Sequence, residues 1–327
     1  LFMEVFLISI GLMSGTSLDG VDAAVIETDG NRIVTFGTSI NVPYPDAFRL
    51  ALRKTLNRDI ELGNIIERDL TMRHAEAVFS LLNKSGLKSS DIGVVGFHGQ
   101  TTFHDPRNGI TRQIGDGQLL ANTLGMIVIN DFRSNDLRNG GEGAPLAPIY
   151  HVAISNSLKG PLCILNLGGV ANVTWVGSKG QFCAFDTGPA NALIDDWVYK
   201  HGRGLMDVDG KIAQSGKVNK KILADLLQDN YFSRAVPKSL DRNYFHNSMI
   251  DLLSVEDGAA TLTAFSGAAV GLGIRFFPEK PLRWLVTGGG RHNSALMSFL
   301  KSFLKMSVEP VENVGWDGDA LEAQAFG

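Results

Sequence analysis

The sequence predicts an α/β protein built from two related lobes. Three glycine-rich segments carry this prediction, because each interrupts apolar runs of strand length; they are Gly11–Asp22, Asn166–Gly169 and Gly288–Gly290. The chain of 327 residues is 44% hydrophobic, which is enough to fill the cores of two domains.

The first segment, Gly11–Asp22, is predicted to be the tip of a β-hairpin that binds phosphate. Glycines 15 and 20 let backbone N–H groups approach an anion closely, and two hydroxyl side chains lie between them. Asp19 and Asp22 could hold a divalent metal ion through water. The residues assigned to the nucleotide here are Gly15, Thr16, Ser17, Leu18, Asp19, Gly20, Val21 and Asp22. An ordinary polar hairpin is the alternative interpretation.

The order of strands and glycine turns recurs in the second half of the chain. Three strands are predicted in each half, at residues 5–10, 23–27 and 32–36 and again at residues 161–165, 170–176 and 181–185. This internal repeat implies two lobes that each offer one glycine hairpin to a ligand between them. Gly168 and Gly169 provide the second hairpin.

The third glycine segment follows an apolar strand at residues 284–287 and leads into a predicted helix, Asn293 to Leu304. A strand, a glycine turn and a helix suit the base or ribose of a nucleotide. The residues assigned to this part are Gly288, Gly289, Gly290 and Asn293. Neither G-x-x-x-x-G-K-[ST] nor G-x-G-x-x-G is present, so the P-loop and Rossmann alternatives fail on spacing.

The remaining elements follow from apolar periodicity. Helices are predicted within residues 46–85 and at residues 190–199, 217–228, 259–276 and 320–326, and a strand is predicted at residues 92–97. The polar, glycine-rich stretch 130–148 contains the crossover between lobes. The predicted divisions are an N-terminal lobe over 1–135, a C-terminal lobe over 136–310 and a C-terminal helix within 311–327.

Asp186 is the predicted general base. It follows an apolar strand and precedes the turn-like Thr187–Pro189, so its carboxylate should project into the cleft between the lobes. A carboxylate that accepts a proton from the attacking nucleophile fits the chemistry of kinases. The alternative is that Asp186 is a helix N-cap.

Arg133 is predicted beside Asp186, because a fixed guanidinium can orient a carboxylate and a sugar oxygen together; a surface salt bridge is its alternative. His98 is interpreted as a support rather than a catalyst. Asp116 could reach the sugar or a metal ion, and its alternative is a turn aspartate. The residues assigned to the sugar are His98, Gly99, Gln100, Thr101, Asp116, Asp131 and Arg133.

Several function classes are excluded by composition and spacing. A net charge of −4 without a run of lysine or arginine gives no case for nucleic acid, and the N-terminal apolar run is too short to span a membrane. Cys163 and Cys183 fall on predicted core strands without metal-ligand spacing, which suits buried thiols in a reducing cytoplasm. His98, His104 and Asp105 match no common transition-metal pattern, and no G-x-S-x-G motif supports a hydrolase.

Eight ungapped segments give the chain a specific resemblance. They are MSGTSLDGVDAA at 13–24, GFHGQT at 96–101, IGDGQLLA at 114–121, NDFRSND at 130–136, GGEGAPLAP at 140–148, LNLGGVANVT at 165–174, FDTGPANALID at 185–195 and VTGGGRHN at 286–293. With these segments the chain resembles the anhydro-N-acetylmuramic acid kinases, bacterial sugar kinases of the superfamily of hexokinase, actin and the Hsp70 ATPase domain.

The resemblance implies a two-lobed actin-like ATPase fold, a duplicated ribonuclease H-like fold with an inter-lobe cleft, whose C-terminal helix packs back on the first lobe. It implies that ATP and Mg²⁺ are used to phosphorylate 1,6-anhydro-N-acetylmuramic acid at O6 while water opens the anhydro ring, and that the protein is a homodimer. A non-catalytic, nucleotide-dependent sugar-binding or chaperone-like protein on the same fold is the alternative.

Two residues depart from the pattern that the resemblance leads us to expect. Ala190 stands where the family segment DTGPGN has its second glycine, which puts the local backbone geometry in question. Met13 stands where the wider superfamily commonly has an aspartate, so the metal ion is expected to be held differently from the ion in Hsp70 or hexokinase.

Overall fold

The computed structural model describes residues 6–15, 17–31, 33–56, 60–245 and 248–327. The chain forms two compact units, one of Leu1–Asn156 with Asp319–Gly327 and one of Ser157–Gly318. Residues 136–156, which we predicted in the C-terminal lobe, therefore group with the first unit. One reason is the contact of Tyr150 with the C-terminal helix, where its hydroxyl donates to Gln324 Oε1 at 2.7 Å.

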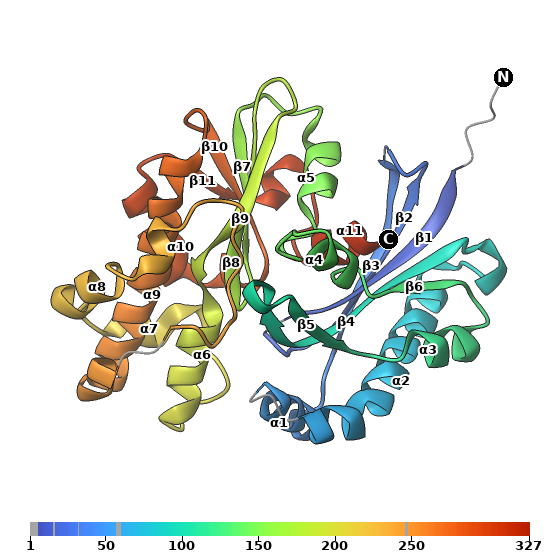
Figure 1. The fold of residues 1–327 in the computed structure, drawn as a ribbon, viewed down its shortest axis with the longest axis horizontal. Coiled ribbons are helices and arrows are strands. Elements are labelled where there is room, and N and C mark those ends of the chain that lie inside the picture. Colours follow the sequence, from blue (N-terminus) through green and yellow to red (C-terminus); the bar gives the residue numbers. More distant parts are fainter. Residues whose placement is uncertain (1–5, 16, 32, 57–59, 246–247) are drawn as a thin grey trace. The chain divides into compact units, whose positions relative to one another are not determined.

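The first unit is a mixed sheet with helices on both faces (Figure 1). Its strands run in the order β3-β2-β1-β4-β5, and β6 also pairs with β4. The elements are β1 (Leu7–Ser14), β2 (Gly20–Thr28), β3 (Ile33–Pro43), α1 (Asp46–Thr55), α2 (Ile60–Ser85), β4 (Val94–Asp105), β5 (Ile110–Ile114), α3 (Gly117–Leu124), β6 (Val128–Asn130), α4 (Ser134–Arg138), α5 (Pro148–Ser155) and α11 (Leu321–Phe326).

The two faces of this sheet are covered by different helices because side chains alternate along a strand. Ile10 and Leu12 point into the core formed with α1, α2 and α3. Between them, Gly11 faces α11, where a Cβ atom would overlap the carbonyl oxygen of Ala323. Gly96, which pairs with Gly11 in parallel register, would likewise meet the carbonyl oxygen of Phe326. Two glycines side by side therefore let the backbone of α11 lie directly on the sheet.

The second unit is built around a sheet with the order β11-β10-β7-β8-β9 (Figure 1). Its elements are β7 (Leu162–Leu167), β8 (Val170–Val176), β9 (Phe182–Pro189), α6 (Asn191–Lys200), α7 (Lys211–Ser215), α8 (Lys220–Leu226), α9 (Val255–Gly273), β10 (Arg283–Thr287), α10 (Ser294–Leu304) and β11 (Ser307–Pro310).

The two sheets repeat one topology. In each unit a three-stranded antiparallel meander, β1-β2-β3 or β7-β8-β9, is extended through its first strand by two parallel strands, β4 and β6 or β10 and β11. The internal repeat read from the glycine turns is thus present in the strand order and direction of both units.

Several boundaries differ from the prediction. The first glycine segment is shorter than expected, because β1 continues to Ser14 and β2 begins at Gly20. Strand β9 continues through Thr187–Pro189, so this segment is not a turn. Strand β4 is twice as long as the predicted 92–97 and forms a hairpin with β5 that we did not predict.

Residues Val255–Phe276 form one apolar helical stretch long enough to cross a membrane, but most of it is buried inside the second unit. Fourteen residues of α9, Gly258 to Val270 and Gly273, are buried, as expected of the central helix of a globular core.

Candidate functional site

The loop between β1 and β2 is short and held at both ends. Gln100, on β4, is fully buried, and its amide accepts a hydrogen bond from Ser14 Oγ at 2.6 Å and donates to the carbonyl oxygen of Gly15 at 3.1 Å. Ser14 Oγ also lies 2.8 Å from the Tyr44 hydroxyl. Gln100, which we predicted to bind the sugar, therefore uses its amide to hold the start of the β1–β2 loop.

Within this loop the predicted residues divide into two groups. Leu18 and Val21 are fully buried, and Gly20 packs against Val42 and Pro43, so these three belong to the core of the first unit. Ser17 and Asp19 are not buried, and Ser17 Oγ donates to Asp19 Oδ1 at 2.7 Å. Thr16 lies outside the described residues.

Asp22 is a carboxyl group of the first unit with a strongly raised pKa. It lies on β2 rather than in the loop, and its Oδ1 accepts from Asn41 Nδ2 at 2.8 Å. Its pKa is raised to about 7, chiefly by burial and also by the negative charges of Asp19, Glu322 and Asp319, while the hydrogen bond from Asn41 opposes this rise. A divalent cation would relieve this concentration of negative charge.

The described residues contain no group of three or more side chains placed to hold a metal ion by themselves. This still fits Mg²⁺, which keeps several waters and binds one or two carboxylates together with substrate phosphates. Asp19 and Asp22 are the two carboxylates that could supply this negative charge.

Arg133 and His98 form a pair in the first unit. The His98 ring donates from Nδ1 to the Gly99 carbonyl at 2.8 Å, so its Nε2 is free of a proton and accepts from Arg133 Nε at 3.0 Å. Burial and the Arg133 charge hold the pKa of His98 well below its usual value, which keeps the ring neutral. Phe326 of α11 packs on the same ring, with centroids 4.8 Å apart. His98 is thus placed as a support for Arg133.

The other residues assigned to the sugar have local roles. Asp116 is the N-cap of α3 and accepts from the Leu119 N–H at 2.9 Å, and Asp131 accepts from the hydroxyl of Ser134 at the start of α4. Thr101 accepts from Gln113 Nε2 at 3.2 Å. Gly99 has a φ of +71°, and a Cβ there would lie 2.5 Å from the Ile114 carbonyl oxygen, so only glycine fits.

In the second unit, two glycine turns meet. Gly290 packs on Leu167 so closely that a Cβ would approach that side chain to 2.6 Å, and a Cβ on Gly288 would overlap Asn166 Oδ1. Asn166 is buried at the end of β7, and its Oδ1 has no hydrogen-bond partner among the described residues. The turn Gly168–Gly169 and the turn Gly288–Gly290 therefore form one continuous patch.

Asn191 orients the β7–β8 turn. Its Nδ2 donates to the carbonyl oxygens of Leu167 and Gly168, each at 2.9 Å, while the backbone N–H groups of Ala190 and Asn191 donate to Gly169 and Gly168. The carbonyl oxygens of the turn therefore accept hydrogen bonds from the first residues of α6 and its N-cap. This arrangement suits a turn that binds an anion through its N–H groups. We did not predict Asn191 or Asn166 as site residues, although Asn166 begins the predicted glycine turn Asn166–Gly169.

Ala190 stands at the N-cap position of α6, with a φ of −128° and a ψ of −114°. Its carbonyl accepts from Ser266 Oγ at 3.2 Å. Its methyl group is fully buried in the core of the second unit.

Asn293, assigned to the nucleotide, caps α10 by accepting from the Leu296 N–H at 3.0 Å. The segment 207–216 lies against it: Ser294 Oγ donates to the Asp209 carbonyl at 2.7 Å, and Gln214 Nε2 donates to Ser294 Oγ at 2.6 Å. We did not predict that the segment 207–216 lies beside the third glycine turn. Its sequence has no glycine pattern typical of a nucleotide-binding loop.

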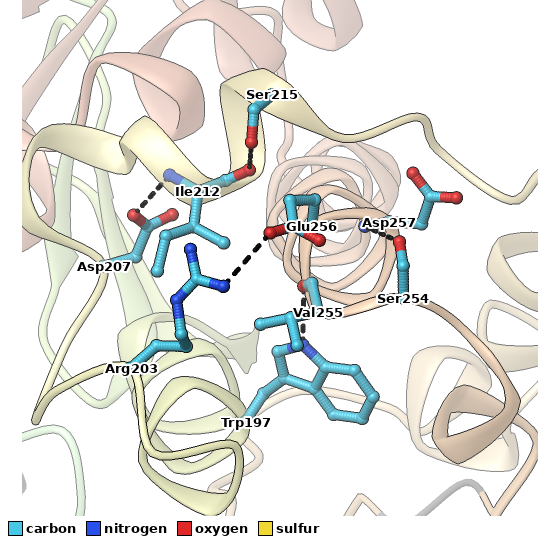
Figure 2. Close-up of polar contacts among 9 residues, drawn as sticks. All are labelled: Trp197, Arg203, Asp207, Ile212, Ser215, Ser254, Val255, Glu256 and Asp257. Atoms are coloured by element: carbon cyan, nitrogen blue, oxygen red, sulfur yellow. Dashed lines mark hydrogen bonds and ion pairs between the residues drawn. The ribbon is translucent and has the colours of Figure 1, made fainter.

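Figure 2 shows the polar contacts within the segment 207–216 and between its neighbours α6 and α9. Asp207 accepts from the backbone N–H groups of Ile212 and Ala213 at the start of α7, and Arg203 bonds to Glu256 at 3.4 Å. Trp197 Nε1 donates to the Val255 carbonyl at 2.8 Å (Figure 2). The segment is thus closed by its own hydrogen bonds to Asp207, and α6 is joined to the start of α9 next to it.

Asp186 lies on β9 and is 6% exposed. Its Oδ2 accepts from the Leu240 N–H at 2.8 Å, and its own N–H donates to the Lys238 carbonyl at 3.0 Å. The N-cap of α6 is Ala190, so the alternative that Asp186 caps a helix is wrong. A carboxylate fixed on a strand is suited to accept a proton at a defined position.

Comparisons with known proteins agree with this description. The family model of anhydro-N-acetylmuramic acid kinase matches residues 7–327. Proteins named anhydro-N-acetylmuramic acid kinase from Paramagnetospirillum magneticum and Rhodospirillum rubrum are 51% and 50% identical over 98% and 97% of this chain, and 91% and 85% of theirs.

Among solved structures, component A of the Acidaminococcus fermentans (R)-2-hydroxyglutaryl-CoA dehydratase is similar, with a TM-score of 0.50, 13% identity and coverage of 98% of this chain and 97% of that one. At that identity the likeness bears on the fold alone, and with the duplicated strand order it confirms the predicted actin-like ATPase fold. The resemblance inferred from the motifs is also confirmed: the chain belongs to the anhydro-N-acetylmuramic acid kinase family.

Proposed function

We propose that this protein is an ATP-dependent phosphotransferase that phosphorylates 1,6-anhydro-N-acetylmuramic acid at O6 and opens its anhydro ring with water. The products are N-acetylmuramic acid 6-phosphate and ADP. Family membership over residues 7–327 supports the proposal, and it does not favour the alternative of a non-catalytic sugar-binding or chaperone-like protein.

The fixed carboxylate of Asp186 is the observation on which the mechanism rests. The anhydro sugar has no free 6-hydroxyl, because its O6 is bonded to the anomeric carbon. Water attacks that carbon and gives a proton to Asp186 as the bond from carbon to O6 breaks. O6 takes the γ-phosphoryl group, and the bond from that phosphorus to the ADP oxygen breaks.

The other residues orient the reactants. Arg133, held through Nε by His98, orients the sugar. The β1–β2 loop and the patch of Gly168, Gly169, Gly288 and Gly290 bind ATP through backbone N–H groups. Mg²⁺, when bound through Asp19 and Asp22, neutralises phosphate charge.

The setting of the reaction is part of the proposal. We propose that the enzyme works in the cytoplasm as a homodimer and returns cell-wall amino sugar to metabolism.

Release of ADP with and without the anhydro sugar tests this function. We expect turnover only when the sugar is present, and Asp186→Asn should lower kcat by roughly 10²–10⁴-fold because the amide keeps the shape but removes the base. ATP should still bind the variant. An Asp186→Asn protein with near wild-type turnover, or a wild-type protein that releases ADP equally fast without sugar, would contradict the proposal.

A further inference from the structure

The segment 238–242 bonds to Asp186, although it forms no helix or strand of its own. The Lys238 carbonyl accepts from the Asp186 N–H at 3.0 Å, and the Leu240 N–H donates to Asp186 Oδ2 at 2.8 Å. Because the segment has no ladder of backbone hydrogen bonds to fix it, other contacts must hold it in place. The position of the Asp186 carboxylate therefore depends on what holds residues 238–242.

Arg242, at the end of this segment, forms a bidentate ion pair with Asp196 of α6. Its Nη1 lies 3.2 Å from Asp196 Oδ2, and its Nη2 donates to Asp196 Oδ1 at 3.3 Å. Two parallel bonds between a guanidinium and a carboxylate fix the orientation of the groups as well as their distance. Since α6 follows β9 after one residue, Ala190, the segment bonds to two consecutive elements of the chain, to β9 at Asp186 and to α6 at Asp196.

Burial makes this ion pair an unlikely device for stability alone. The side chain of Arg242 is 8% exposed and that of Asp196 is 37% exposed. Arg242 Nε is buried and has no hydrogen-bond partner among the residues that the structure describes. Removing a guanidinium from water is costly, and one partly exposed carboxylate offsets little more than that cost. The bidentate geometry therefore favours a role in placing the segment.

We propose that Arg242 and Asp196 are positioning residues for the kinase: their ion pair fixes the segment 238–242, so that the Leu240 N–H holds the Asp186 carboxylate where it receives the proton of the attacking water. This inference rests on the proposed function. An ion pair that served stability alone would change the thermal midpoint of its variants and would leave their turnover well below that midpoint as it is in the wild type.

Separate values of kcat and KM distinguish the two roles. Asp196→Asn keeps the shape of the side chain but removes its charge, so kcat should fall roughly 10–10²-fold because the base is misplaced. KM for ATP and for the sugar should stay close to the wild-type values. Arg242→Lys keeps the charge without the two parallel bonds and should lose less kcat than Arg242→Met.

Lys200→Met is the matched control, because it removes another ion pair of α6, with Asp251 at 2.6 Å, that does not involve the segment 238–242. It should keep the wild-type kcat. An Asp196→Asn enzyme with wild-type kcat overturns the inference and leaves the proposed function intact.

Amide hydrogen exchange tests the same link without turnover. The Leu240 N–H, which is bonded to Asp186, can be followed by mass spectrometry of a peptide that contains residue 240. In Asp196→Asn it should exchange roughly tenfold faster, because the local opening that frees it becomes easier. Lys200→Met should leave its exchange unchanged. Wild-type exchange at Leu240 in Asp196→Asn would overturn the inference. If the wild-type protein shows no sugar-dependent ADP release, the proposed function fails, and the exchange rates still decide whether the ion pair fixes the segment.

Discussion

Gly168 offers a residue-scale test of the nucleotide site, because the fold has room for a side chain there. A Cβ on Gly168 would make only ordinary contact, 3.6 Å from the Val170 carbonyl oxygen. Gly168→Val should therefore fold normally, but its branched side chain would stand where phosphate approaches the turn. ATP affinity should fall at least tenfold, a loss of ~1.4 kcal/mol. Calorimetric titration measures this loss, and wild-type affinity with an unchanged thermal midpoint would contradict the placement of the phosphates.

His74 predicts how stability depends on pH. It is fully buried, its Nδ1 lies 2.8 Å from the Leu70 carbonyl, and burial lowers its pKa to about 4. The unfolded chain therefore binds a proton at this site at higher pH than the folded chain does. Stability from the neutral ring is fully present above the unfolded pKa of about 6.5 and is lost as the pH falls towards 4.

The expected contribution of His74 over that pH range is at most roughly 3 kcal/mol. His74→Leu should reduce the fall in thermal midpoint between pH 7 and pH 4.5, whatever its effect at neutral pH. His292→Leu, at an exposed position, serves as the comparison. If both variants lose stability with the same slope as the wild type, protonation of His74 does not limit acid stability.

At the residue scale, the sequence showed which polar side chains lie near the glycine segments, but it did not show what each of them contacts. Asp116 was recognised as polar and adjacent to glycines, but whether it faces ligand or caps α3 depends on where the helix starts. Gln100 lies in a family motif, yet its bonds to Ser14 and Gly15 depend on the register between β1 and β4. Contacts between distant segments of the chain decide both roles, and local patterns do not contain them.

At the element scale, α11 depends on two glycines far away in the sequence. Gly96→Ala would drive a methyl group into the Phe326 carbonyl, so α11 must shift or detach. We expect a loss of about 1–3 kcal/mol and weaker packing of Phe326 on His98. Thermal unfolding measures the loss. Gly271→Ala, inside α9 with its nearest neighbour, Phe303 Cβ, at 3.7 Å, is the matched control and should be neutral or stabilising.

A second readout of the same variant links α11 to catalysis. Phe326 contacts the His98 ring that accepts the Arg133 hydrogen bond, so displacement of α11 should raise KM for the sugar more than KM for ATP. Equal stability of Gly96→Ala and wild-type protein would contradict the close approach of α11 to the sheet.

Helices were predictable where apolar periodicity is strong, and a strand of mixed composition was not. The helices predicted at 190–199 and 293–304 are present as α6 and α10, and each end is shifted by one residue or less. The hairpin of β4 and β5 was missed because His98–His104 mixes polar residues and glycine, a composition that reads as a loop. Pairing with β5 and β1 supplies the stability that this stretch lacks as an isolated strand.

At the scale of the whole molecule, the duplication was the most predictable feature. Two halves with the same order of strands and glycine turns indicated two related lobes, and both sheets have the predicted antiparallel meander. The limits of the units could not be read in the same way. Residues 136–156 and Asp319–Gly327 belong to the first unit because α5 and α11 contact each other through Tyr150 and Gln324, an interaction between segments far apart in the chain.

The central claim is that water activated by Asp186 opens the anhydro ring while O6 receives the phosphoryl group. The fate of the water oxygen tests it most directly. When the wild-type enzyme works in water labelled with ¹⁸O, mass spectrometry of the product should find the label on the anomeric hydroxyl and none in the phosphate. Label in the phosphate would mean that water attacks phosphorus instead of carbon, and it would contradict the mechanism assigned to Asp186.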